Sequence, residues 1–428
     1  MAMRYERGGI FGLTISSVIS RHQRAQLSYD ELDRKSNALA RGLQGIGVKK
    51  GDRVAVSLGN SVEFAISTYA LFKLGAILNP LNPSFNAQQV VSATKHLDTS
   101  HLIIGAETNL SRKPPRNNVQ LLEHLAPGLR GGMLESESVP SLKEIVLVDN
   151  SSGRVDAAEL KATVPFEAIL AGSGRTLPDQ GLHKDDVVNI QYTSGTTSTP
   201  KAACLSHRSI LNNGMQIGDR MLLTPSDIVC CPPPLFHCFG CILGYMATAT
   251  HGSAIVFPTE AFDPLATLKA VQEYKATALY GVATMFLAEL ELLADGTVPY
   301  EGFQHLRTGI AAGSSVPAEL MRKLHRILNL HDLTICYGMT ETSPERHDEY
   351  PRSDPEAHRN RRTPDAARRG QSGGCAGPHE DPRSARARRA GRIGVPAHER
   401  VLGRPGENGR GDDRGPRGAG ESVDVDRG

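Results

Sequence analysis

Residues 187–201 read Val-Val-Asn-Ile-Gln-Tyr-Thr-Ser-Gly-Thr-Thr-Ser-Thr-Pro-Lys, an apolar segment followed by hydroxyl residues, one glycine, a proline and a lysine. The apolar part, Val187 to Ile190, predicts a strand. Hydroxyls, together with backbone N–H groups that small residues leave accessible, give a turn several donors for phosphate, and a lysine adds positive charge. We therefore interpret this turn as a polyphosphate-binding loop formed by Thr193, Ser194, Gly195, Thr196, Thr197 and Lys201.

The alternative for this stretch is a solvated loop between two secondary elements, which is what most clusters of Ser, Thr and Gly are. The order of the ten residues from Tyr192 to Lys201, rather than their polarity alone, favours phosphate binding. The stretch lacks the Gly-Lys-Ser/Thr ending of a Walker A motif, so it does not indicate a P-loop NTPase.

Composition excludes several classes of protein. The formal net charge of the 428 residues is only +2, which gives no bulk electrostatic reason to expect a nucleic acid or an acidic membrane as partner. No charged and then apolar leader follows Met1, and the nearest candidate for a membrane span, Cys238 to Ala249, is too short. We expect an intracellular protein, cytoplasmic or organellar (mitochondrial or peroxisomal), with no signal peptide and no integral membrane segment.

The seven cysteines are few for this length and suit a reducing compartment better than a disulfide framework. His237, Cys238 and Cys241 suggest zinc as an alternative use, but a single C-x-x-C pair without a second pair is a weak signal.

Helical and strand patterns alternate from Ser28 to Tyr337, beginning with a predicted capping box of Ser28 and Glu31. Repeated βα units imply an α/β fold with parallel sheets covered by helices, and ligands at the C-terminal ends of the strands. We expect surface loops over residues 107–142. The predicted helices are 28–43, 62–74, 86–97, 206–213, 263–274, 283–293 and 317–328, with Pro317 in the first turn of the last, and the predicted strands are 53–58, 76–78, 101–104, 145–148, 187–190, 253–257, 277–280, 306–311 and 333–337.

Two of the predicted strands open into turns with chemically useful groups. The first turn contains Gly313, Ser314 and Ser315, where backbone groups stand among small side chains and a planar base could lie. The second begins with an aromatic ring that could stack on adenine, then offers a hydroxyl for phosphate and a carboxylate for Mg²⁺. Taken singly, a glycine turn, a tyrosine or a glutamate at such a place more often has a structural role than a ligand-binding one. The residues of the second turn are Tyr337, Gly338, Thr340 and Glu341.

With these turns and the loop at 193–201 in this order and spacing, the chain resembles the adenylate-forming superfamily of acyl-CoA synthetases, luciferases and nonribosomal peptide adenylation domains. The resemblance covers about residues 27–344. Within the superfamily, the segments Asn79 to Pro83 and Pro234 to His237 are most similar to the medium-chain acyl-CoA synthetases. It implies that residues 1–344 form a large N-terminal adenylate-forming domain with helix-covered, mostly parallel sheets. Amino-acid or aryl-acid activation is the alternative chemistry, but no aspartate follows Phe236 or Phe239 to pair with an α-amino group.

The resemblance implies that a carboxylic (fatty) acid reacts with ATP and Mg²⁺ to give an acyl-adenylate and pyrophosphate, and that coenzyme A then takes the acyl group. It gives no indication of oligomeric state. It implies catalytic roles for Lys201, His237, Thr340 and Glu341, with His237 at the mouth of the acyl pocket. It implies Mg²⁺ ligands at Thr197 and Glu341, and nucleotide binding by Thr193, Ser194, Gly195, Thr196, Thr197, Lys201, Gly313, Ser314, Ser315, Tyr337, Gly338 and Thr340.

Residues 345–428 do not resemble the family. They contain no lysine and 18 arginines, are rich in Gly and Pro, and are too poor in apolar residues to offset the entropy of ordering, so we expect a disordered tail. The aspartate that binds ribose, the hinge and the C-terminal lid domain with its catalytic lysine are missing. We therefore expect ligase activity to be impaired or absent in the chain as given, with a non-catalytic ATP- or AMP-binding remnant as the alternative.

Our hypothesis for the tail is an out-of-frame translation that begins at about Pro344. Codons can be chosen for Val401 to Gly409 so that the frame one nucleotide later encodes YWGDPEKT, which is similar to the ribose-binding region of the family, and the same frame gives family-like sequence at two other places.

The nucleotide sequence tests this hypothesis directly. When the gene is translated one nucleotide later from about Pro344, we expect the sequence to continue into a hinge and a lysine-bearing lid. A shifted frame without such a continuation contradicts the hypothesis. It would favour an Arg/Gly-rich tail that binds RNA, although 15 acidic residues nearly offset the 18 arginines there.

Overall fold

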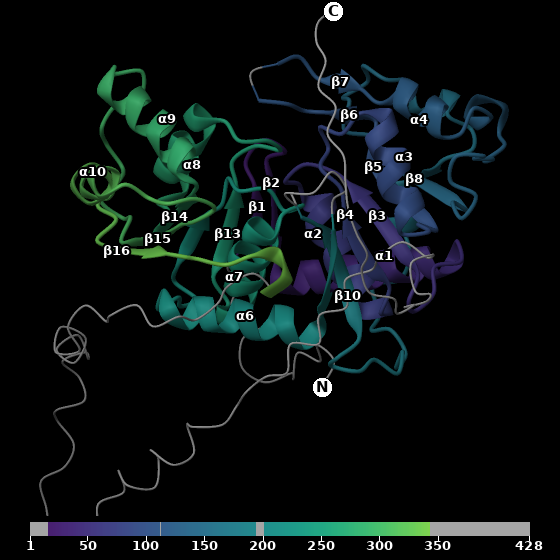
Figure 1. Ribbon diagram of the computed structural model, residues 1–428, viewed down its shortest axis with the longest axis horizontal. Helices are drawn as coiled ribbons and strands as arrows, with labels where there is room; N and C mark the ends of the chain where they lie inside the picture. Colours follow the sequence, from purple (N-terminus) through teal and green to yellow (C-terminus); the bar gives the residue numbers. More distant parts are fainter. Residues whose placement is uncertain (1–15, 112, 194–200, 343–428) are drawn as a thin grey trace, which may run out of the picture.

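The computed structural model describes residues 16–111, 113–193 and 201–342, and it contains two seven-stranded sheets (Figure 1). Every pairing within them is parallel except β1–β2 and β10–β11. Sheet A has the order β16 (Asp332–Ile335), β15 (Thr308–Ala311), β14 (Ala278–Gly281), β12 (Ile228–Cys230), β13 (Ala254–Phe257), β1 (Ser16–Ser20), β2 (Ala25–Ser28), and sheet B the order β11 (Ala202–Ser206), β10 (Val187–Tyr192), β4 (Ile77–Pro80), β3 (Arg53–Ser57), β5 (His101–Gly105), β8 (Glu144–Val148), β9 (Val164–Pro165).

Helices lie on both faces of each sheet, so the molecule has five layers (Figure 1). The layer between the sheets consists of α1 (Tyr29–Gly45), α2 (Val62–Leu74), α6 (His207–Arg220) and the π-helix η3 (Phe239–Met246), which continues into α7 (Ala247–His251). The outer face of sheet A is covered by α8 (Pro264–Tyr274), α9 (Ala283–Ala294) and α10 (Ala318–Leu328), and that of sheet B by α3 (Ala87–His96) and α4 (Val119–Leu125). The small remaining elements are α5 (Phe166–Leu170), β6 (Glu107–Thr108), β7 (Arg116–Asn117), and the 3₁₀ turns η1 (Leu129–Gly131), η2 (Ala157–Glu159) and η4 (Thr340–Thr342).

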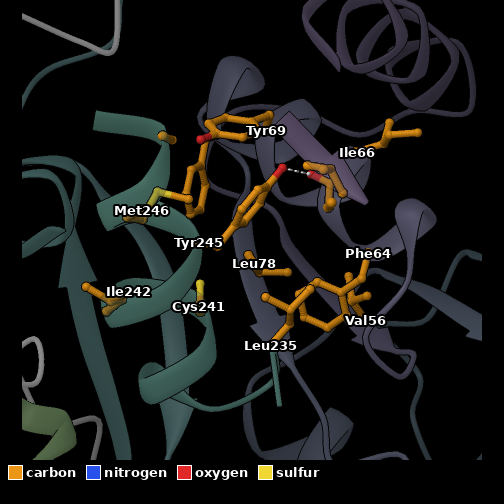
Figure 2. Packing of buried hydrophobic residues seen from close by; sticks show 14 of the residues in the cluster. Val56, Phe64, Ile66, Tyr69, Leu78, Leu235, Cys241, Ile242, Tyr245 and Met246 are labelled. Carbon is orange, nitrogen blue, oxygen red and sulfur yellow. Dashed lines mark hydrogen bonds between the residues drawn. The ribbon is translucent and has the colours of Figure 1, made fainter. Parts of the chain in front are cut away.

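Strand side chains alternate between the central layer and an outer layer. In β3, Val54 and Val56 pack into the central core, whereas Ala55 packs on the outer side. Because a strand covered on both faces is apolar on both, its sequence is a short continuous apolar run, as Val54 to Val56 is. Figure 2 shows the central core where η3 meets α2: the hydroxyl of Tyr245 donates to the Ala65 carbonyl oxygen at 3.2 Å.

The structure confirms the predicted α/β alternation, including the capping box of Ser28 and Glu31 at the start of α1. Several local predictions were wrong. Residues 107–142 contain α4 besides loops, because Leu121, Leu122 and Leu125 are buried in the outer core of sheet B. The helix that begins after Ser206 continues to Arg220, and Pro317 stands at the N-cap of α10 rather than in its first turn. The sequence interpretation also missed β1, β2, β11, β12 and η3.

The C-terminal ends of the parallel strands of the two sheets lie close together. Asn60, which follows β3 in sheet B, hydrogen-bonds to Pro233 and Leu235, which follow β12 in sheet A. Its backbone N–H also donates to the carbonyl oxygen of Glu260, which follows β13. Ligands of doubly wound sheets bind at this edge.

Glu289 on α9 is a carboxylic acid in an apolar core, fully buried, and neither of its oxygens has a hydrogen-bond partner among the described residues. Burial raises the pKa of Glu289 well above its usual value. Once pH exceeds the pKa that Glu289 has in the unfolded chain, a further rise in pH therefore lowers the free energy of unfolding. We expect Glu289→Met to increase the free energy of unfolding at pH 8 by about 1–3 kcal/mol, and by less at pH 4.

Urea unfolding at both pH values measures this effect. The matched control is Glu291→Met, because Glu291 is exposed on the same helix and should change stability little. A destabilised Glu289→Met protein would contradict the prediction.

His22, between β1 and β2, is a half-buried titratable group, and the protein around its ring lowers its pKa to about 4. Since the folded-state pKa lies below the unfolded value of 6.5, the stability that neutral His22 provides is present above pH 6.5 and is lost as pH falls toward 4. We expect His22→Gln to make stability less dependent on pH in this window, by on the order of 1–3 kcal/mol. Chemical denaturation at intervals between pH 4 and 7 tests this, and parallel profiles for the two proteins would contradict it.

Candidate active site

The predicted phosphate loop is closed at its base by the β10–β11 hairpin. The Thr193 N–H donates to the carbonyl oxygen of Lys201 at 2.9 Å, so the residues on either side of the loop are held together. Lys201 is exposed, and the hydroxyl oxygen of Thr193 is buried without a partner in the described structure. A buried oxygen of this kind requires a partner, which water or a ligand can supply. The other predicted residues of this loop, Ser194, Gly195, Thr196 and Thr197, lie outside the described residues.

The turn after β15 presents backbone rather than side chains. Gly313 has φ +85°, a conformation that favours glycine, and a Cβ there would lie 3.1 Å from Val282 Cγ1. Gly313, Ser314 and Ser315 are exposed. The turn therefore offers an open surface against which a planar group can lie.

The turn after β16 lies beside the turn after β15. β15 and β16 are paired in parallel, and the Cys336 N–H continues the pairing by donating to the Ala311 carbonyl oxygen at 3.1 Å. Tyr337, the next residue, has 66% of its surface exposed, so its ring is available for stacking. Gly338 beside it is also exposed.

The two ends of the site meet where η4 packs against β11, the strand that follows Lys201. Thr340 in η4 is buried, with 9% of its surface exposed, and Glu341 beside it is half-buried. The structure thus brings Thr340 and Glu341 to the same edge as Thr193 and Lys201.

His237 reaches this edge from the segment that joins β12 to η3. Its neighbour Cys238 places Sγ 3.8 Å from Thr340 Oγ1 and 3.7 Å from His237 Nδ1. The Phe239 N–H donates to Nδ1 at 3.1 Å, so Nδ1 is the acceptor and the proton of the neutral ring is on Nε2. Although His237 is exposed by surface area, the protein atoms crowded around the ring lower its pKa. His237 is therefore a neutral Nε2–H donor.

The contact between Cys238 and Thr340 was missed by sequence reasoning. Cys238 begins a buried apolar run, and only the three-dimensional packing brings its thiol to a hydroxyl 102 residues away. Burial raises the pKa of Cys238 to about 11 and that of Cys241 to about 12, which keeps both thiols protonated at neutral pH. The described part of the chain has no group of three or more His, Cys, Asp or Glu side chains that could hold a metal ion.

The oxygen donors at this edge suit Mg²⁺ better than zinc. Mg²⁺ prefers one or two carboxylates together with phosphate oxygens and water, and the Glu341 carboxylate at the open edge fits that pattern. The other predicted ligand, Thr197, lies outside the described residues. Within the described ranges, none of the helices is both long and apolar enough to cross a membrane.

Comparison with known proteins gives one family and many relatives. The model of the AMP-binding enzyme family matches residues 15–366. An acyl-CoA ligase, sidI of Aspergillus fumigatus, is 39% identical over 327 residues, which are 75% of this chain and 52% of that protein. The mitochondrial medium-chain acyl-CoA ligase ACSF2 of Danio rerio is 32% identical over 317 residues, covering 71% of this chain and 50% of the relative. The chain thus spans about half the length of these curated relatives.

Solved structures share the fold. The N-terminal domain of FACL13 from Mycobacterium tuberculosis aligns with a TM-score of 0.63 at 20% identity, over 77% of this chain and 73% of that one. A long-chain-fatty-acid-CoA ligase of Archaeoglobus fulgidus aligns with a TM-score of 0.63 at 21% identity, over 77% and 62% of the two chains. The match of the family model to most of the sequence, on a fold shared with these ligases, shows that the chain belongs to the AMP-binding enzyme family.

Proposed function

We propose that this chain carries the ATP- and carboxylate-binding core of an acyl-CoA ligase. The observation that carries the proposal is the meeting of three elements at one edge of the sheets. The hairpin end brings Thr193 and Lys201, η4 packs on β11 with Thr340 and Glu341, and Cys238 joins η4 to His237 through a contact of 3.8 Å. The relatives named as acyl-CoA ligases support the same activity.

The proposed reaction has two steps. A carboxylate oxygen forms a bond to the α-phosphorus of ATP, the bond from that phosphorus to the oxygen bridging to the β-phosphate breaks, and pyrophosphate leaves with the electron pair. The thiolate of coenzyme A then attacks the carbonyl carbon of the acyl-adenylate, and AMP leaves. The first step brings two anions together, so the site must neutralise charge and hold both reactants in position.

The residues of the chain are suited to these tasks. Lys201 supplies a cation beside the loop, and the Thr340 hydroxyl is proposed to bind the α-phosphate. Tyr337 stacks on the base above the open backbone at Gly313, and Ser314 and Ser315 add hydroxyls there.

Mg²⁺, when bound to the phosphate oxygens, supplies further charge neutralisation, and the Glu341 carboxylate would hold it. Thr197 is proposed as the second ligand. The Nε2–H of the neutral His237 ring is proposed to donate a hydrogen bond to the acyl carboxylate.

A second candidate is a nucleotide-binding chain without ligase activity. It is favoured by the sequence of residues 345–428, which contains no lysine that could assist adenylation. For either candidate we propose an intracellular location, because ATP and coenzyme A are intracellular. The ACSF2 relatives are named as mitochondrial proteins.

Calorimetric titration with MgATP tests the nucleotide site. We expect Lys201→Met to weaken binding about tenfold or more, since a hydrogen bond to a charged phosphate is lost. The matched control is Lys269→Met, because Lys269 is an exposed lysine on α8 away from this edge. Equal affinities of the two variants, or a wild-type chain that does not bind MgATP, would contradict the proposal.

Pyrophosphate release in the presence of octanoate separates the two candidates. Release that depends on the fatty acid and on Lys201 identifies adenylation. Binding of MgATP without release identifies the second candidate.

A further inference from the structure

The position of His237 depends on the segment that precedes it, Pro232 to Phe236, which joins β12 to η3 and has no secondary structure of its own that could fix it. The bonds local to His237 continue into η3: its N–H donates to the Pro234 carbonyl oxygen at 3.1 Å, and its carbonyl oxygen accepts from the Cys241 N–H at 3.0 Å. The position of the imidazole therefore depends on Pro233, Pro234 and Leu235 before it as well as on η3 after it.

Asn60 binds this segment from the other sheet. It lies between β3 and α2, with 1% of its surface exposed. Its side-chain N–H donates to the Pro233 carbonyl oxygen at 3.0 Å, and its Oδ1 accepts from the Leu235 N–H at 2.7 Å. One amide therefore satisfies a donor and an acceptor two residues apart, because its N–H donates while its oxygen accepts. The Asn60 N–H also donates to the Glu260 carbonyl oxygen at 2.9 Å.

The segment is enclosed on its other sides as well. The side chain of Leu235 is buried beside Phe64 and Val56, as Figure 2 shows. On η3, Gly240 lies so close that a Cβ there would collide with the Pro234 carbonyl group. The Asn60 amide, the Leu235 side chain and the backbone of Gly240 thus contact the segment from different directions.

We infer that Asn60 is a positioning residue for the proposed ligase site, where it holds residues 233–235 so that His237 presents Nε2–H to the acyl group. The inference rests on the proposed function in its reference to the acyl group. Asn60 touches neither proposed substrate. It acts through residues 233–235. The position of His237, which follows a strand of sheet A, thus depends on Asn60, which follows a strand of sheet B.

The competing explanation is that Asn60 only stabilises the fold, which any buried residue with two hydrogen bonds does. The neighbouring Ser61 provides the control for this. Ser61 is also buried, with 5% exposed, and its hydroxyl caps α2 by accepting from the Phe64 N–H at 3.2 Å. Ser61→Ala should lower stability without disturbing residues 233–235.

The experiment compares the full chain with Asn60→Leu, Asn60→Asp and Ser61→Ala. Asn60→Leu removes both side-chain hydrogen bonds. Asn60→Asp keeps the size of the side chain and the acceptor for the Leu235 N–H, but it replaces the donor to the Pro233 carbonyl by a carboxylate oxygen. The first readout is the pair of ring ¹⁵N chemical shifts of His237, measured in protein with ¹⁵N-labelled histidine. The His237 signals are assigned as those that are missing from the spectrum of the His237→Asn variant. These shifts report which ring nitrogen carries the proton.

The second readout is affinity for two ligands. An acyl sulfamoyl-adenosine, which mimics the acyl-adenylate and is not hydrolysed, reaches the acyl side of the site, whereas AMP does not. We expect both Asn60 variants to change the His237 shifts. We expect them to bind the acyl analogue about tenfold more weakly, with AMP affinity unchanged within about twofold. Ser61→Ala should lower the melting temperature and leave both readouts as in the wild type.

The inference is overturned if the Asn60 variants lose stability but keep the wild-type His237 shifts, or if Ser61→Ala changes the shifts as much as they do. Absence of AMP binding in the wild-type chain would count against the proposed nucleotide site, and the His237 shifts would still decide the role of Asn60.

Discussion

The structure depends on a layer of helices shared by two sheets. α1, α2, α6 and η3 bury side chains against both sheets at once, so each sheet has one face on the shared core and the other on its own outer helices. Burial of apolar surface on both faces dominates the stability of such an arrangement. Because both faces of each sheet are covered, the ends of the strands remain for contact with ligands. The described candidate residues lie at or next to these ends.

The shared layer explains why the two halves of the candidate site lie next to each other. Residues from sheet B (Thr193, Lys201) and from sheet A (Thr340, Glu341) approach because η4 packs on β11 and because loops of both sheets exchange hydrogen bonds at Asn60. These loop contacts are few but buried, and buried polar groups are costly to leave unpaired. A small number of hydrogen bonds can therefore fix the relative position of the candidate site residues that different sheets supply.

Much of this was predictable from the sequence, for physical reasons that differ between elements. Ser28 with Glu31, and Gly75 after α2, are local signals, because capping and a left-handed C-cap involve neighbouring residues only. The turns at Gly313 and Tyr337 were found because their residue types are unusual at strand ends. By contrast, β1 was missed because its pairing with β13 is entirely non-local. η3 was missed because glycine is a poor helix former, and the close packing of Gly240 against Pro234 and of Gly244 against Cys231 is visible only in three dimensions. No local pattern indicated that Asn60 or Cys238 would contact the segments they do.

The pairing of β1 with β13 also bears on how the chain acquires its structure during synthesis. Val18 pairs with Ile255, so the first described strand cannot join its sheet until most of the described chain has been made. Sheet B, from β3 to β11, is complete in sequence well before that point. At ribosomal rates of about 5–20 residues per second, β1 and β2 wait for at least roughly ten seconds with their apolar residues unpaired. The nascent chain therefore passes through a stage in which one sheet is complete while the other has only its edge hairpin, and chaperones that shield exposed strands would act in this interval.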